Sequence, residues 1–110
     1  LQVEVYASSM DADQLVRFAN ARVNEEPSLI LIAFSLKETS RLVVIAGREA
    51  VERGIHAGKL ASRAAAQAGG RGGGTPRLGQ GGGLVREKLE EAEGLLISLI
   101  NEMAAEAQGK

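Results

Sequence analysis

Cysteine is absent from the 110-residue sequence, and His56 is its only histidine. Disulfide bonds and thiolate chemistry are therefore excluded, and a zinc site of the usual Cys/His type is not expected. Aromatic residues make up only 3% of the chain, so the core must consist of Leu, Ile, Val and Ala. The stacking platforms of single-strand binders are also missing. We expect no metal and no cofactor.

Long hydrophobic runs and targeting signals are absent as well. The longest apolar run, Leu29 to Phe34, has the length of a strand and falls far short of the roughly 18 residues of a membrane span. No basic segment followed by an apolar one opens the chain, as a signal peptide would require. We therefore expect a cytoplasmic protein without a membrane partner. Since residue 1 is not Met, we interpret residues 1–110 as a single domain excised from a longer chain.

Catalytic patterns are missing too. The acidic residues fall on the outer faces of predicted helices, and nothing in the sequence pairs two of them for acid–base chemistry. His56 with Ser40 or Ser62 lacks the nucleophile-elbow pattern, and the glycine-rich stretch lacks the spacing of a nucleoside-triphosphate loop. We do not expect this domain to be an enzyme on its own.

The charges, in contrast, are distributed unevenly. The net charge of −1 hides a basic middle: residues 48–88 hold eight basic and three acidic residues, a net charge of +5. The flanking residues 1–47 and 89–110 carry net charges of −2 and −4. A local basic patch on a nearly neutral domain indicates that one face contacts a polyanion.

The segment Gly69 to Gly83 lies inside this basic region and holds nine of the fourteen glycines. Glycine permits positive φ angles and close approach of a backbone to a large ligand. Bare N–H groups beside Arg71 and Arg77 are suited to phosphates, so we interpret the segment as a shaped loop that binds phosphate. A flexible linker is the alternative, although arginine, leucine and glutamine among the glycines are unusual for one.

Hydrophobic periodicity predicts the other elements. Alternation over Gln2–Ala7, with Val3 and Val5 against polar neighbours, predicts a half-buried strand. Asp11 and Gln14 form a capping-box pattern, and the helix that follows must end before Pro27. Two apolar strands, 29–36 and 41–47, flank a polar turn at 37–40 and should pair as a hairpin. The first two strands should run parallel, because a helix connects them.

Two more helices are expected in the second half. From residue 57 to 68 alanines form the buried stripe, and Lys59, Arg63 and Gln67 form a basic stripe that leads toward Arg71. Val85 to Met103 predicts a final amphipathic helix, with a frayed polar tail at 106–110. We therefore predict an α/β (α+β) fold: a small mixed sheet of three to four strands packed against helices, with a structured Gly-rich loop and a C-terminal amphipathic helix.

The segment Ala57–Gly83, AGKLASRAAAQAGGRGGGTPRLGQGGG, resembles the C-terminal, DHHA1-type domain of alanyl-tRNA synthetases. The shared pattern is a small-residue helix followed by glycines, a basic residue, proline and glutamine at fixed spacings. Leu78 and Gly79 depart from it, standing where methionine and alanine are frequent, and Arg77 replaces an acidic or small residue. Thr75 occupies the region where related phosphoesterases carry a histidine.

The resemblance implies a non-catalytic module that contacts the elbow of an alanine-accepting tRNA and helps couple aminoacylation with editing. Its partners would be this tRNA and the rest of the synthetase chain. The loop positions that the resemblance carries over are Gly70, Arg71, Gly72, Gly73, Gly74, Pro76, Gln80 and Gly82. With the cationic side chains added on the charge argument, the predicted nucleic-acid-binding residues are Lys59, Arg63, Gly70, Arg71, Gly72, Gly73, Gly74, Thr75, Arg77 and Gln80. Two alternatives stay open: a dimerisation or protein-interaction module that uses residues 95–100, and a nucleotide-binding accessory domain of a DHH-type phosphoesterase.

Overall fold

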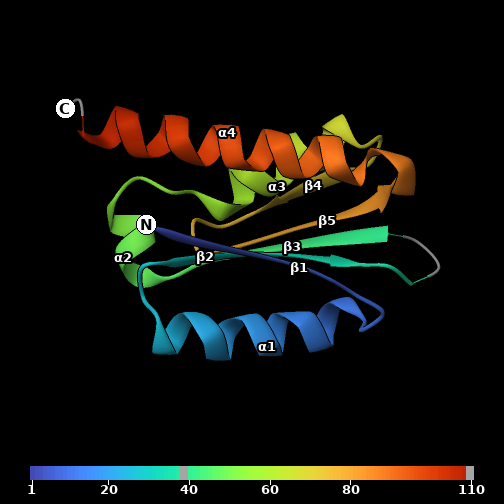
Figure 1. The fold of residues 1–110 in the computed structure, drawn as a ribbon, viewed down its shortest axis with the longest axis horizontal. Coiled ribbons are helices and arrows are strands. Elements are labelled where there is room, and N and C mark those ends of the chain that lie inside the picture. The colour runs from blue at the N-terminus through green and yellow to red at the C-terminus, as the bar shows by residue number, and fades with distance from the viewer. Residues whose placement is uncertain (38–39, 109–110) are drawn as a thin grey trace.

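A computed structural model describes residues 1–37 and 40–108. Figure 1 shows three layers, with α1 (Ala12–Glu25) on one face of a sheet and α3 (Ala57–Gln67) and α4 (Leu89–Gln108) on the other. The short helices α2 (Arg48–Glu52) and η1 (Arg86–Lys88) lie in the connections. The α/β prediction is confirmed.

Within the described residues the sheet has five strands rather than the three or four predicted, in the order β1-β2-β3-β5-β4. The first pair, β1 (Gln2–Ser8) and β2 (Leu29–Ser35), is parallel as predicted, and β2 forms the predicted antiparallel pair with β3 (Ser40–Ala46). The additional strands are β4 (Arg71–Gly74) and β5 (Leu78–Leu84), which come from the Gly-rich segment. Residues 38 and 39 of the predicted turn at 37–40 lie outside the described residues.

The interior strand β2 is buried at every position, because helices cover both faces of the sheet. Alternate β2 side chains enter two apolar clusters. Ile30, Ile32 and Phe34 face α3 and α4, whereas Leu29, Leu31 and Ala33 face α1. A strand with two buried faces explains why this stretch of sequence is continuously apolar instead of alternating.

The helix boundaries follow local signals. Asp11 caps α1 through the predicted capping box, in which its carboxylate accepts the N–H of Gln14 at 2.9 Å. His56 is the N-cap of α3, where its Nδ1 accepts the N–H of Lys59 at 3.1 Å. The expectation of a frayed tail is wrong for part of 106–110, since α4 continues to Gln108; residues 109 and 110 lie outside the described range.

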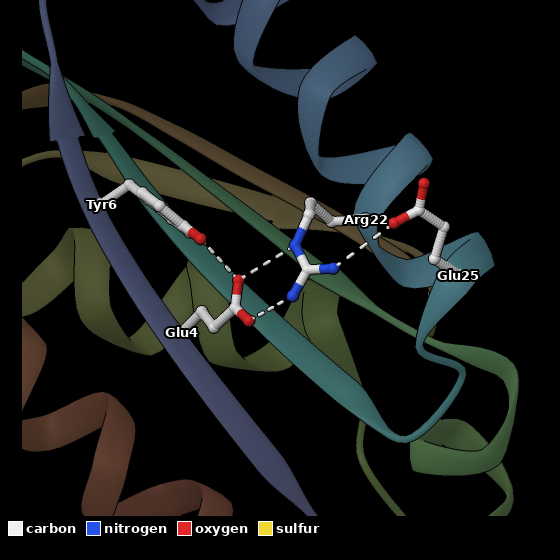
Figure 2. A network of polar contacts seen from close by, with 4 residues as sticks. All are labelled: Glu4, Tyr6, Arg22 and Glu25. Carbon is white, nitrogen blue, oxygen red and sulfur yellow. Dashed lines mark hydrogen bonds and ion pairs between the residues drawn. The ribbon is translucent and has the colours of Figure 1, made fainter.

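The edge strand β1 alternates as predicted, but its half-buried side chains are the polar ones. Val3 and Val5 remain 37% and 36% exposed. Glu4 and Tyr6 face α1, where the Tyr6 and Phe18 rings meet edge to face at a centroid distance of 5.1 Å. Arg22 of α1 donates hydrogen bonds to both Glu4 oxygens, and the Tyr6 hydroxyl donates to the same carboxylate at 2.6 Å (Figure 2). This polar network fixes the edge strand to α1.

The network predicts an acid-sensitive contribution to stability. The hydrogen bond from Arg22 lowers the pKa of Glu4 below its usual value, so folding favours the carboxylate. Its stabilising effect is complete above the unfolded-state pKa of Glu4 and is lost as the pH falls through the lower folded-state pKa. Glu4→Gln should therefore melt below the wild type near neutral pH, and the difference in melting temperature should shrink below about pH 4. A difference that is constant with pH would contradict this role of the ion pair.

Candidate nucleic-acid interface

The Gly-rich segment is a β-hairpin at the far edge of the sheet, and not the loop that the sequence indicated. Strands β4 and β5 pair in register from Arg71 opposite Gly82 to Gly74 opposite Gly79, and β5 also pairs with β3. Two residues, Gly82 and Gly83, lie opposite Arg41 where the register shifts, and Gly83 has a φ of +70°. The flexible-linker alternative is thereby excluded.

One face of this hairpin lies directly against α3. A Cβ atom added at Gly79 would lie 2.2 Å from the carbonyl oxygen of Ala57, and one at Gly81 would lie 2.8 Å from the Cβ of Ala65. At Gly72 the nearest atom would be the Ala61 oxygen at 2.7 Å. These glycines therefore allow the alanine stripe of α3 to pack on the strand backbone itself, a purpose that sequence reasoning did not assign to them.

The start and the end of α3 hold the hairpin in place. The N–H groups of Ala57 and Gly58 donate to the carbonyls of Pro76 and Thr75 at 2.9 and 2.8 Å, which satisfies two free donors of the first helical turn. At the other end Gly69, with φ +87°, and Gly70 close the helix, since the Gly70 N–H donates to Ala65 at 2.7 Å. Both ends of β4 are thus anchored to one helix.

The opposite face of the hairpin is open. Because strand residues alternate between faces, Arg71, Gly73, Gln80 and Gly82 lie on the side away from α3. No atom lies within 4 Å of a Cβ added at Gly73 or Gly82. The helix α1 packs on β2 and β3, and Figure 1 shows it on this side of the sheet. The result is a surface of bare backbone beside exposed Arg71 and Gln80, which we call the open glycine face.

Backbone polar groups extend along the outer edge of β4. The Thr75 N–H donates to Leu78 at 2.9 Å, so the antiparallel alternation makes Gly73 and Arg71 the residues that hydrogen-bond to β5. The N–H and C=O groups of Gly72 and the N–H of Gly74 consequently point away from β5, whereas the Gly74 carbonyl lies against the start of α3, where a Cβ added at Gly58 would be 2.4 Å from its oxygen. These donors and acceptors add to the charge that Arg71 supplies.

A hollow adjoins the open glycine face at the end where β5 begins. It is lined by Val23 and Asn24 of α1, by Pro27, and by Arg48 and Arg77. Phe18 and Arg22 of α1 face β1 on the other side of this helix. Helical spacing therefore directs Asn20, like Asn24, toward the hairpin. Sequence reasoning missed Arg48 and Asn24, because no local pattern relates them to Arg77.

The predicted binding residues divide into separate groups in the structure. Arg71, Gly73 and Gln80 share the open glycine face, Gly72 and Gly74 form its edge, and Arg77 lies at its end. Lys59 and Arg63 are exposed on α3, which covers the opposite face of the hairpin. The predicted continuous stripe from Lys59 and Arg63 to Arg71 is therefore wrong: the helix and Arg71 lie on opposite sides of the β4–β5 layer.

Thr75 and Gly70 have local structural roles. The Thr75 hydroxyl accepts the N–H of Leu78 at 3.1 Å and so stabilises the turn between β4 and β5. A Cβ at Gly70 would lie 2.1 Å from the Gly82 carbonyl oxygen, which makes a side chain impossible there without a shift of β5.

Residues 1–37 and 40–108 contain no group of three or more His, Asp or Glu side chains that could hold a metal ion. No helix in the same ranges is long and apolar enough to cross a bilayer.

The fold and this hairpin define a small α/β domain, and comparison with known families identifies which one. The DHHA1 domain model matches residues 2–102. The chain therefore belongs to the DHHA1 domain family, as the motif at 57–83 indicated. In fold it is similar to the C-Ala domain of Aquifex aeolicus alanyl-tRNA synthetase, with a TM-score of 0.76, 21% sequence identity and coverage of 94% of this chain and 89% of that one.

Sequence relatives lead to the same group of proteins. The alanine–tRNA ligase of Leptospira interrogans is 35% identical over 83 residues, which cover 76% of this chain and 8% of the relative. That of Halalkalibacterium halodurans is 34% identical over 87 residues, covering 77% of this chain and 10% of the relative. The chain thus spans a tenth or less of the length of these relatives.

A glycine-to-alanine substitution should destabilise the protein on one face of the hairpin and have little effect on stability on the other. Gly79→Ala should destabilise the protein by about 1–3 kcal/mol, because its methyl group would overlap the α3 backbone. Gly73→Ala, which meets open space, should leave stability within roughly 0.5 kcal/mol of wild type. Urea unfolding of the two variants provides the measurement. Equal losses would mean that close packing on α3 is not what requires glycine in this hairpin.

Proposed function

We propose that this chain is a non-catalytic tRNA-binding domain of an alanine–tRNA ligase, with the open glycine face as its RNA contact. In this proposal it binds the elbow of an alanine-accepting tRNA and helps present one tRNA to the aminoacylation and editing sites. Those sites would belong to the remainder of the ligase. The ligase would act in the cytoplasm. Similarity to alanine–tRNA ligases supports the assignment to this enzyme.

The observation that carries the proposal is the open glycine face itself. A ligand can approach the backbone at Gly73 and Gly82 without meeting a side chain, and exposed Arg71 and Gln80 stand beside them. Folded RNA presents phosphates and ribose hydroxyls on a rigid contour, which such a surface fits better than it fits flexible single strands. Arg71 would contact phosphate, while Gln80 and the outward N–H groups of β4 would donate to ribose or base edges.

Substitution at Arg71 tests the proposal. Arg71→Ala should weaken binding of an alanine-accepting tRNA transcript by about three- to tenfold, and should reduce the slope of log K against log salt by roughly one phosphate equivalent. Its melting temperature should not fall, since Arg71 is exposed. Arg53→Ala is the matched control, because Arg53 lines a groove beside Leu1 and Val3, away from the hairpin.

Two further outcomes of the tRNA titration show where the RNA contact lies. Lys59→Ala and Arg63→Ala should have smaller effects, unless the RNA extends around the β4 edge onto α3. If Arg71→Ala binds tRNA with unchanged affinity and salt slope, the open glycine face is not the RNA contact.

A dimerisation module is the second candidate function. It is supported by apolar side chains that are exposed at the surface. Leu96, Leu99 and Ile100 of the predicted 95–100 face are buried, but Ile97 is 37% exposed. Leu1, and Val3 and Val5 of β1, are exposed to similar extents. If these residues pair two copies, sedimentation equilibrium should give a dimer that Ile97→Lys dissociates without loss of melting temperature. A monomer at all accessible concentrations would exclude this candidate.

A further inference from the structure

The hollow between α1 and the β4–β5 turn brings together two arginines that are 29 positions apart in sequence. Arg48 opens α2 directly after β3, and Arg77 directly precedes β5. Because β3 and β5 are neighbouring antiparallel strands, the last residues of β3 and the first residues of β5 lie side by side at one end of the sheet. Asn24, from the last turn of α1, adds an amide to the same hollow.

Neither arginine is paired with an acid in the part of the chain that the structure describes. In the described residues the only ion pairs involve Arg22, and neither Arg48 nor Arg77 donates a side-chain hydrogen bond to protein. Three acids adjoin the lining residues in sequence. Glu25 pairs with Arg22 at 3.6 Å, and neither Glu26 nor Glu49 forms an ion pair with Arg48 or Arg77 in the described residues. Since both arginines line one hollow, their guanidinium groups would repel each other on entering it together, and an anion bound between them would relieve that repulsion.

The backbone holds both arginines in place through one short segment. The Ala46 N–H donates to the Arg77 carbonyl at 2.9 Å, and the Glu49 N–H donates to the Pro27 carbonyl at 3.0 Å. Between these bonds, Gly47 approaches Pro27 so closely that an added Cβ would lie 2.2 Å from the Pro27 oxygen. The positions of Arg48 and Arg77 are thus coupled, which lowers the entropic cost of engaging one ligand with both.

The size of the hollow and its donors indicate the ligand. Its volume of about 220 Å³ is smaller than the roughly 300–1,000 Å³ of pockets that enclose a drug-sized ligand. It is ample for one phosphate, whose oxygens suit the planar fork of arginine. We propose that Arg48, Arg77 and Asn24 bind a single phosphate of the RNA that covers the open glycine face. This assignment rests on the proposed function and extends the RNA contact past the turn at Thr75.

A double-mutant cycle tests whether the two arginines share one phosphate. Arg48→Gln and Arg77→Gln should each weaken binding of the alanine-accepting tRNA transcript by about three- to tenfold and reduce the salt slope. In combination they should cost little more than either alone, because the first substitution already loses the shared phosphate. Arg53→Gln supplies the same charge change away from the hollow. No variant should melt below the wild type, since Arg48, Arg53 and Arg77 are all exposed.

A second arm uses inorganic phosphate followed by NMR of the arginine side-chain N–H groups. Saturable shifts of Arg48 and Arg77, lost for Arg48 in Arg77→Gln, would support a phosphate site directly. Such shifts without any loss of tRNA affinity in the variants would mean a site for free phosphate and overturn the RNA assignment. Additive losses in the cycle, or losses equal to that of Arg53→Gln, would overturn the shared site.

This design separates failure of the inference from failure of the proposed function. If Arg71→Ala binds tRNA normally while the Arg48/Arg77 cycle is coupled, RNA uses the hollow but not the open glycine face. If Arg71→Ala is weakened while the cycle is additive, the proposed function stands and the shared phosphate does not.

Discussion

The contact between the alanines of α3 and the glycines of the β4–β5 hairpin is the constraint on which the rest of the structure depends. A helix can lie this close to a strand only where neither surface carries a side chain larger than a methyl group. Burial of such small side chains yields little hydrophobic free energy for each residue. Backbone hydrogen bonds at both ends of α3 therefore contribute much of what holds the hairpin in place.

This contact also determines what the other face of the hairpin offers. Glycine has no side chain to present, so the face away from α3 is bare backbone at Gly73 and Gly82. Glycine loses more backbone conformational entropy on folding than any other residue. In this hairpin that entropy is lost when the domain folds, so it is not lost again when a ligand binds. A ligand would then meet a backbone that is already ordered, with the exposed side chains of Arg71 and Arg77 attached beside it.

Local sequence signals anticipated several elements because their causes are local. The Asp11–Gln14 capping box and the apolar runs of β2 and β3 act over a few residues, and the structure has each of them. The hairpin β4–β5 was not anticipated, since glycine disfavours strands when it is considered alone. Pairing with β3 and packing on α3 override that preference. The burial of Glu4 and Tyr6 was missed for a related reason: period 2 predicts alternation but does not say which set of side chains meets a helix.

By itself, then, the sequence determined the class of fold, the central apolar strands, the helix caps and the presence of a basic, Gly-rich segment. Tertiary structure alone decided which residues share a surface. It separated Lys59 and Arg63 from Arg71, because a β-layer has two faces and a helix covers only one. It also joined Arg48 to Arg77, because antiparallel strands bring the end of one beside the start of the next. Both are long-range consequences of strand pairing, which no local pattern of residues encodes.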